Sequence, residues 1–514
     1  MALTQRRNAM ICRAVLAAAL LCYLFIAWAV PYSCTDDLQW GMEQGVRWWK
    51  YGLLNGRYAG NLCAVLMCHF PLVKVLLMGG GMFAIPVLMA ALMARGDRER
   101  FLPMFLTANG MILLMPPVMW TEVYGWVSGF GNYGMSAAVF LAFLLLVRRA
   151  HQKKDRPKAR AALLLGWALV MGLFVETLSL LFVGVTLVLG LYSIWDRALR
   201  LPYWAGFAGA VLAAVLVFSN GVLADLLGQG SALQGLRNLS FPPGSGPLTA
   251  GTCILQWYFR KLLPIAFLRG VHMAFPMAVI IALGFWNSRL RPLAVLGLLP
   301  LGTFFLIWSA EDYQTWYHAA AGCLCWGLVF LALAAVKCEP ELKIHRLLLY
   351  LAAPLALLPL AATTTLGQRF YFLPTLILIM LAMDLAAPLL TARAGTWAVG
   401  LAAAGLMLLW GYRGAVTASC TQARSAEISR VSAAGEDRLI LPTDRYYRIF
   451  WVDRNPWNVE YASYFRQFYG IAEDVTLIFL PGGSDETWPD YTPEQWENRL
   501  EFAPSDDFVS SLPQ

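Results

Sequence analysis

Long apolar runs, separated by short charged loops, fill most of the first 412 residues of the chain. The runs are close to the ~20 residues that an α-helix needs to cross a bilayer. We therefore predict thirteen membrane-spanning helices. They are expected near residues 14–31, 75–94, 101–119, 133–147, 161–175, 177–195, 201–223, 271–286, 292–309, 318–336, 347–362, 370–390 and 397–412.

The fifth and sixth of these helices share one apolar stretch, residues 161–195, which only Glu176 interrupts. At about 1.5 Å of rise per residue the stretch is short for two crossings. It also lacks a turn signal around Glu176. Whether it crosses the membrane once or twice is left open by the pattern.

Two loops on the same side of the predicted bundle are long. Residues 32–70 mix aromatic, polar and apolar positions, which favours one or two amphipathic helices lying along the membrane surface. Residues 224–270 contain a proline- and glycine-rich centre that cannot be helical, and their end, 254–269, predicts another interfacial helix. A long loop beside a membrane site suits substrate gating.

The last hundred residues follow a different pattern, with more charge and shorter apolar runs. Runs of strand length lie at 438–442, 447–452 and 475–480. We predict a transmembrane module over 1–413 and a small α/β or irregular subdomain over 414–514 that rests on it.

Composition and charge sharpen this picture. The chain is 59% hydrophobic and 14% charged, which excludes a soluble globular protein and indicates an all-α polytopic membrane protein. Most Lys and Arg residues fall in alternate loops, such as 148–160, which predicts an N-terminus inside and a C-terminus outside. The net charge of +8 is therefore mainly an orientation signal, and its scatter over short loops argues against nucleic-acid binding.

Asp36 and Asp37 are the leading candidates for chemistry, because adjacent carboxylates at a bilayer surface are costly. One of them can act as a general base on an acceptor hydroxyl, or hold a cation that binds a phosphate. The alternative is that they cap the start of an interfacial helix.

Asn55 and Arg57 belong to an Asn-Gly-Arg-Tyr segment in the same loop. Arg57 can pair with the acids or hold a phosphate with two parallel hydrogen bonds. The alternative is a turn followed by an arginine at the membrane surface.

The loop 120–133 combines Glu122, Asn132 and Tyr133 with tryptophans and glycines. Aromatic faces with polar edges suit sugar rings, and glycines allow close backbone approach. The same composition is also typical of an aromatic belt with turn glycines.

Two further charges lie at apolar helices. Glu176 needs a polar cavity or a partner such as an arginine, in a site or in a purely structural role. Arg369, where the twelfth span begins, can bind an anionic lipid headgroup or extend to the headgroup region. Glu311, Asp312 and His318 form one more polar group, equally compatible with a solvated loop.

Together these residues resemble the GT-C glycosyltransferase superfamily, polytopic enzymes that use polyprenyl-phosphate sugars. The superfamily carries an acidic pair after the first span, and its best-marked acid corresponds to Asp36. The chain is similar to a bacterial branch with Asp-Asp, Asn-Gly-Arg, a Trp/Gly/Asn-Tyr segment (126–133) and an intramembrane Glu. The tail segment 455–470 also resembles that branch. The whole tail departs from the pattern of oligosaccharyltransferases, because it is well under the size of their large outer domains, and this argues against a protein acceptor.

The resemblance implies an inverting transferase in the bacterial cytoplasmic membrane. It would move a sugar from a polyprenyl-phosphate donor to a glycan or lipid acceptor at the outer face. Asp36 would act as the base, Arg57 or Arg369 would meet the phosphate, and a divalent cation such as Mg²⁺ or Mn²⁺ is optional, with no ligands assigned. The alternatives are a transporter or flippase of a lipid-linked glycan, with two related halves, and a polymerase or ligase of another fold.

Overall fold

The computed structural model describes residues 2–32, 34–52, 54–152, 156–219, 240–242, 245–267, 271–308, 316–362, 367–442, 459–480 and 500–502. Several expectations lie outside these residues: Glu311 and Asp312, the part 224–239 of the loop 224–270, the strand 447–452 and the segment 455–458. His318 is described and is buried in a helix rather than placed in a solvated loop.

Eight helical segments among the described residues are long and apolar enough to cross a membrane, which makes this chain a helical polytopic protein. Helices also cover the other predicted ranges, but those helices are shorter. The eight segments are Arg6–Ala29, Pro71–Ala94, Val127–Gln152, Arg197–Phe218, Trp316–Ala335, Pro340–Ala362, Gln368–Leu390 and Arg393–Ala434.

The elements that build these segments are α1 (Ala2–Ala29), α5 (Pro71–Lys74), η1 (Val75–Gly79), α6 (Gly80–Ala94), α9 (Val127–Gly129), η2 (Phe130–Gly134), α10 (Met135–Gln152), α13 (Arg197–Phe218), α19 (Trp316–Ala335), α20 (Pro340–Leu357), η5 (Leu358–Ala362), η6 (Gln368–Tyr371), α21 (Phe372–Leu390) and α22 (Arg393–Ala434). The shorter helices between them are α7 (Arg98–Leu113), α8 (Pro117–Val123), α11 (Pro157–Gly172), α12 (Glu176–Tyr192), α17 (Val271–Trp286), η4 (Arg291–Leu298) and α18 (Leu299–Trp308).

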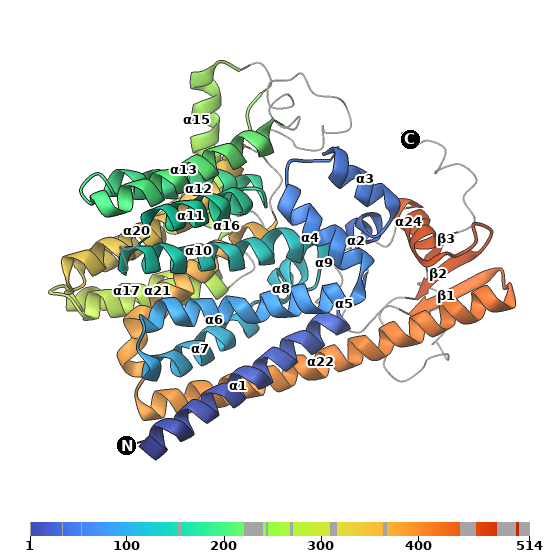
Figure 1. The fold of residues 1–514 in the computed structure, drawn as a ribbon, viewed down its shortest axis with the longest axis horizontal. Helices are drawn as coiled ribbons and strands as arrows, with labels where there is room; N and C mark the ends of the chain where they lie inside the picture. Colours follow the sequence, from blue (N-terminus) through green and yellow to red (C-terminus); the bar gives the residue numbers. More distant parts are fainter. Residues whose placement is uncertain are drawn as a thin grey trace.

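The helix expected over 101–119 is not continuous. Helix α7 ends at Leu113, and α8 continues from Pro117 after a bend of 95°. Pro116 and Pro117 lack the N–H groups that would continue the helix, and a proline also disfavours helical geometry in the residue before it. The bend turns the segment that carries Glu122 back toward the bundle (Figure 1).

The ambiguous stretch 161–195 forms two helices, α11 and α12, separated at 173–175. The break leaves the carbonyl of Leu173 without a helical partner, and the backbone N–H of Ala59 donates to it at 3.0 Å. Glu176 is therefore the first residue of α12 rather than a charge in the middle of a span.

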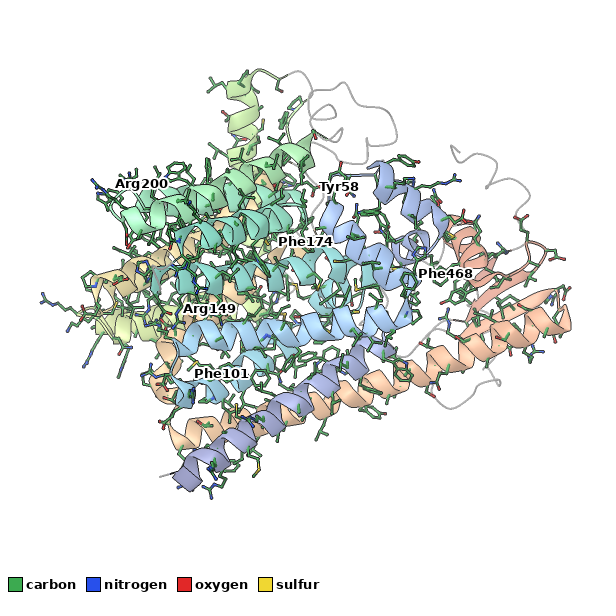
Figure 2. All side chains as sticks on the ribbon, viewed as in Figure 1. Tyr58, Phe101, Arg149, Phe174, Arg200 and Phe468 are labelled. Carbon is green, nitrogen blue, oxygen red and sulfur yellow. The ribbon has the colours of Figure 1, made fainter. Side chains whose placement is uncertain are left out.

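The long helices run side by side, and the two ends of the bundle differ (Figure 1). Arg149 and Arg200, from two of the basic loops, lie at one end, whereas Tyr58 and Phe468 lie at the other (Figure 2). These two basic loops, which the sequence places on the same side of the membrane, thus lie at the same end of the folded bundle.

The first long loop forms three helices, where one or two were expected: α2 (Thr35–Trp40), α3 (Glu43–Tyr51) and α4 (Tyr58–His69). In the second, the single helix expected over 254–269 begins earlier and has three parts: α15 (Pro247–Trp257), η3 (Tyr258–Leu262) and α16 (Leu263–Ile265).

Helix α22 runs without a break through the boundary expected between residues 413 and 414. Its 42 residues give a length of about 60 Å at 1.5 Å per residue, about twice the hydrocarbon thickness of a bilayer. Beyond it, β1 (Arg438–Pro442) pairs in parallel with β2 (Thr476–Leu480), which pairs antiparallel with β3 (Leu500–Phe502). Helix α24 (Val459–Tyr469) lies between the first two strands in sequence.

These C-terminal elements have a hydrophobic cluster of their own, which we call the tail cluster. It joins the strands and α24 to the second half of α22 and, across the chain, to Leu38 of α2. Its buried members are Leu38, Ile428, Val431, Leu439, Leu441, Ala462, Tyr464, Phe465, Ile471, Val475, Leu477 and Phe479.

Leu477→Ala tests this cluster. The Leu477 side chain is fully buried in the central strand, and its truncation should cost about 2–5 kcal/mol. We expect protease in detergent to release the tail much faster while the spans stay intact. Thr476→Ala, at a half-buried neighbouring position, is the matched control, and equal cleavage rates in the two variants would contradict the cluster.

Candidate functional site

The Asn-Gly-Arg segment forms a turn that starts α4. The side-chain oxygen of Asn55 accepts from the backbone N–H of Arg57 at 3.1 Å, the geometry of an Asx turn. The same oxygen accepts from Nδ2 of Asn61 one helical turn later, at 2.9 Å. Gly56 lies against the backbone of Val217, where a Cβ would collide. The motif is thus held both by its own side chains and by α13.

Arg57 and Glu176 form an ion pair with 2.9 Å between Nε and Oε2. Both side chains are mostly buried, at 16% and 10% exposure. Because Glu176 is the first residue of α12, its carboxylate is also stabilised by the positive end of that helix. The pair joins the first long loop to the break between α11 and α12.

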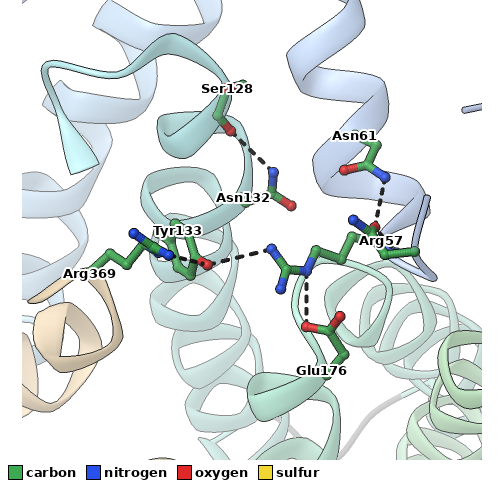
Figure 3. A network of polar contacts seen from close by, with 8 residues as sticks. Arg57, Asn61, Ser128, Asn132, Tyr133, Glu176 and Arg369 are labelled. Atoms are coloured by element: carbon green, nitrogen blue, oxygen red, sulfur yellow. Dashed lines mark hydrogen bonds and ion pairs between the residues drawn. The ribbon is translucent and has the colours of Figure 1, made fainter. Parts of the chain in front are cut away.

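Tyr133 lies between two arginines (Figure 3). Its hydroxyl oxygen accepts from Nη1 of Arg57 at 3.4 Å and from Nε of Arg369 at 3.2 Å. Tyr133 belongs to η2, a single π-helical turn within a longer helix, a feature that is frequent at functional sites. Two guanidinium groups therefore converge on one phenol oxygen.

Arg369 has a carboxylate of its own. Glu122 accepts from the Arg369 backbone N–H at 2.9 Å and lies 3.6 Å from Nη1. The guanidinium also stacks near the rings of Trp126, Tyr133 and Phe370, with 5.2–5.6 Å from Cζ to each ring centre. Cation–π attraction of this kind holds the arginine in place without using its hydrogen-bond donors.

Asn132 adjoins this group through α4 and its own helix. Its Nδ2 donates to the carbonyl of Ser128 at 3.1 Å. Its Oδ1 is buried, has no hydrogen-bond partner among the residues that the structure describes, and lies against Gly60 of α4, where a Cβ would collide with it. The close approach of α4 to η2 thus depends on a glycine.

The two carboxylates of the acidic pair have different surroundings. Asp37 is completely buried and accepts from the backbone N–H groups of Ser128 at 2.7 Å and Val127 at 3.3 Å. It thus caps the N-terminus of α9, the start of the helix that continues into α10. The cap expected from the sequence was at the start of the interfacial helix itself, and α2 has no side-chain cap there. Asp36 is exposed in the first turn of α2, the helix that also carries Asp37.

Burial raises the pKa of Asp37 from its usual range to about 7. The hydrogen bonds from Ser128 and Val127 favour the charged form and oppose this shift only in part, while the charge of Asp36 adds to it.

Seven of the nine residues selected from the sequence therefore form one polar group, the arginine–tyrosine network: Asn55, Arg57, Glu122, Asn132, Tyr133, Glu176 and Arg369. Asn132 enters it by packing against α4. Asp37 joins it through Ser128, which donates to Asp37 and accepts from Asn132. The network carries two positive and two negative charges, yet within the described residues Nη2 of neither Arg57 nor Arg369 has a hydrogen-bond partner.

No group of three or more His, Cys, Asp or Glu side chains in the described ranges is arranged to hold a metal ion.

Sequence reasoning missed Asn61, Ser128 and Lys74 as parts of this region. Asn61 is a lone polar residue in the apolar helix α4, four positions after Arg57, and this spacing was a usable signal. Lys74 is buried, and its Nζ donates to the carbonyl of Val30 at 2.6 Å, at the C-terminal end of α1. Its position at the start of a span gave no indication of that partner.

No model of a known protein family, no curated protein and no solved structure matches this chain. The resemblance to the GT-C superfamily accordingly remains an expectation from short motifs, and the site has to be interpreted from its own geometry.

Glu176→Gln tests the central ion pair. The variant leaves Arg57 charged and mostly buried without its carboxylate, which should cost roughly 3 kcal/mol. We expect the apparent Tm in detergent to fall by several degrees. Glu436→Gln breaks an exposed pair with Arg430 instead, and should leave Tm nearly unchanged; similar Tm values for both variants would argue against a structural role of the pair.

Asp37 gives a pH prediction. Because its pKa is raised from 3.8 to about 7, folding favours the protonated form. This contribution to stability is fully present below about pH 4 and is lost as pH rises through about 7, with a slope of about 1.4 kcal/mol per pH unit. The difference in apparent Tm between wild type and Asp37→Asn, measured from pH 4 to 9, should change in favour of wild type as pH falls. A difference that is constant over this range would contradict the assignment.

Proposed function

We propose that the chain is an inverting membrane glycosyltransferase that takes a sugar from a polyprenyl-phosphate donor. The observation that supports this most is the pair of guanidinium groups that meet at Tyr133. Each is fixed by its own carboxylate and keeps donors for an anion. A phosphate at the membrane surface is an anion for which two arginines are well suited.

The acidic pair supplies the second half of the chemistry. The exposed Asp36 takes the proton of an acceptor hydroxyl as that oxygen attacks the anomeric carbon of the sugar. The bond from this carbon to the phosphate oxygen breaks, and the electron pair leaves with the polyprenyl phosphate. Arg57 and Arg369 stabilise the negative charge that develops there. Attack opposite the leaving group inverts the anomeric centre.

The two aspartates thus take different parts. Asp37, buried and bonded to two backbone N–H groups, holds α2 against the start of the helix with Asn132 and Tyr133. Its charge, when ionised, makes the neighbouring carboxylate of Asp36 a stronger base.

The proposed membrane arrangement has thirteen crossings, the N-terminus inside and the C-terminal tail outside, in the cytoplasmic membrane of a bacterium. The site and the tail then lie at the outer face, where a lipid-linked donor and a glycan or lipid acceptor are both available. The concentration of basic loops at the opposite end of the bundle supports this orientation.

A transporter or flippase of a lipid-linked glycan remains the second candidate, because α7 and α8, with a bend of 95° between them, form a broken span or a re-entrant loop. Broken helices are typical of transport sites near the middle of the membrane. Against this, the charged residues of the arginine–tyrosine network lie at or next to helix ends rather than at the centres of spans. Purified protein in liposomes with a radiolabelled polyprenyl-phosphate hexose separates the two, since only a transferase breaks the sugar–phosphate bond.

Asp36→Asn tests the proposed base in cells that carry only this copy of the protein. Loss of proton acceptance should lower transfer by about 100-fold or more. We expect altered surface-glycan composition and build-up of the lipid-linked donor at normal protein level. Glu43→Gln, an exposed acid of α3 in the same loop, is the matched control; unchanged glycan in Asp36→Asn cells would remove Asp36 from the reaction.

A further inference from the structure

Helix α2, which carries the acidic pair, is held from two sides. On one side Asp37 bonds the backbone at the start of α9. On the other side Leu38 is buried in the tail cluster with residues of α24 and the sheet. Figure 1 shows α2 beside both α9 and α24. A six-residue helix has little stability of its own, so these neighbours determine its position.

Helix α24 contacts the C-terminal end of α2 at Phe468. A Cβ on Gly41, directly after α2, would collide with the Phe468 ring, so that ring lies on the backbone where the helix ends. The ring also packs 5.7 Å from Tyr32, centre to centre. The hydroxyl of Tyr469 donates to the carbonyl of Tyr32 at 3.3 Å. Both ends of the acidic helix are thus in contact with the tail.

Tyr32 is itself fixed from the other direction. Its hydroxyl donates to the carbonyl of Met67 at 2.9 Å, and Nζ of Lys74 lies 4.6 Å from the centre of its ring. The tail therefore docks on a residue that α4 and α5 already hold in place, and the acidic helix is enclosed between rigid partners.

We propose that α24 is a positioning element for the acidic pair: by docking on α2 it keeps water away from Asp37 and so sets the pH range in which the site works. The control of the working pH range by α24 rests on the proposed function. The exclusion of water from Asp37 does not, because it can be measured without any transfer reaction.

The titratable and charged groups around Asp37 come from several elements. Asp36 lies on the same helix, and Tyr32 precedes it. Cys68 of α4, Lys74 of α5 and Tyr469 of α24 also interact with Asp37. Arg424 of α22 is near Tyr469. Desolvation is the largest influence on Asp37, and displacement of α24 changes it by admitting water while leaving Asp36, Cys68 and Lys74 in place.

The experiment uses Phe468→Ala in the full chain, with and without Asp37→Asn. For each pair, the difference in apparent Tm is followed from pH 4 to 9. The pH at which its slope reaches half of the full value, called the midpoint below, is the pKa of Asp37 in the folded protein. Wild type should have a midpoint near 7, the value to which burial raises this pKa. Phe468→Ala should move the midpoint down by about one pH unit or more, toward that of a solvated carboxylate.

Phe502→Ala is the matched control, because it removes an equal ring from the same tail. Phe502 packs on Phe479 of the central strand, 6.0 Å between ring centres, and belongs to β3 rather than α24. Its midpoint should remain that of wild type. A midpoint that stays near 7 in Phe468→Ala, or that falls equally in Phe502→Ala, would overturn the proposal.

Gly41→Ala decides the matter if Phe468→Ala fails to fold. It leaves every tail residue in place and only adds a methyl group where the Phe468 ring lies. Its midpoint should also fall, and an unchanged midpoint would overturn the proposal in the same way.

The fall of the transfer rate on the acid side of its pH profile, called the acid limb, links the titration of Asp37 to function. With radiolabelled polyprenyl-phosphate hexose and membranes as the acceptor source, the limb should move with the Tm midpoint in Phe468→Ala. If the Tm midpoint moves but wild type shows no transfer at any pH, the positioning role of α24 stands and the proposed function fails. If transfer occurs and its acid limb does not move, the control of the working range is overturned.

Discussion

The ion pair between Arg57 and Glu176 is the interaction on which the candidate site depends. Each charge would be costly alone in surroundings with so little water, and together they offset most of that cost. The pair also determines chain geometry, since it connects the turn before α4 to the first residue of α12. Tyr133, and through it Arg369, is positioned against a guanidinium that this carboxylate holds in place.

The polar groups of the site lie mostly at helix ends rather than in helix centres. Asp37 caps one helix, Glu176 begins another, and Arg57 directly precedes a third. The physical reason is that helix ends have unpaired backbone groups that must find partners in a low-dielectric environment. A site assembled from chain breaks at one end of a helical bundle therefore satisfies the backbone and collects charged side chains in the same place.

The local sequence pattern indicated individual features of this site, but it did not indicate contacts between residues that are distant in the sequence. The Asn-Gly-Arg segment indicated a turn, and the lone Glu176 indicated a missing cation, because the cost of a buried charge is visible in the sequence. The bend after Leu113 was missed even though Pro116 and Pro117 were a local signal for it, since the apolar run continues through them. The unbroken α22 was missed for the opposite reason: rising polarity suggested a boundary, but no proline accompanies it.

Hydrophobic runs, loop charges and the positions of isolated polar residues determined that this is a helical membrane protein and which side chains were costly to bury. The tertiary structure alone decided which of these meet. Arg57 and Glu176 are 119 positions apart, and Tyr133 and Arg369 are 236 apart, so no local periodicity connects them. The tertiary structure also gave the two adjacent aspartates different surroundings, since Asp37 is buried and Asp36 is exposed. The reason is that burial depends on what packs over a helix and not on the order of residues within it.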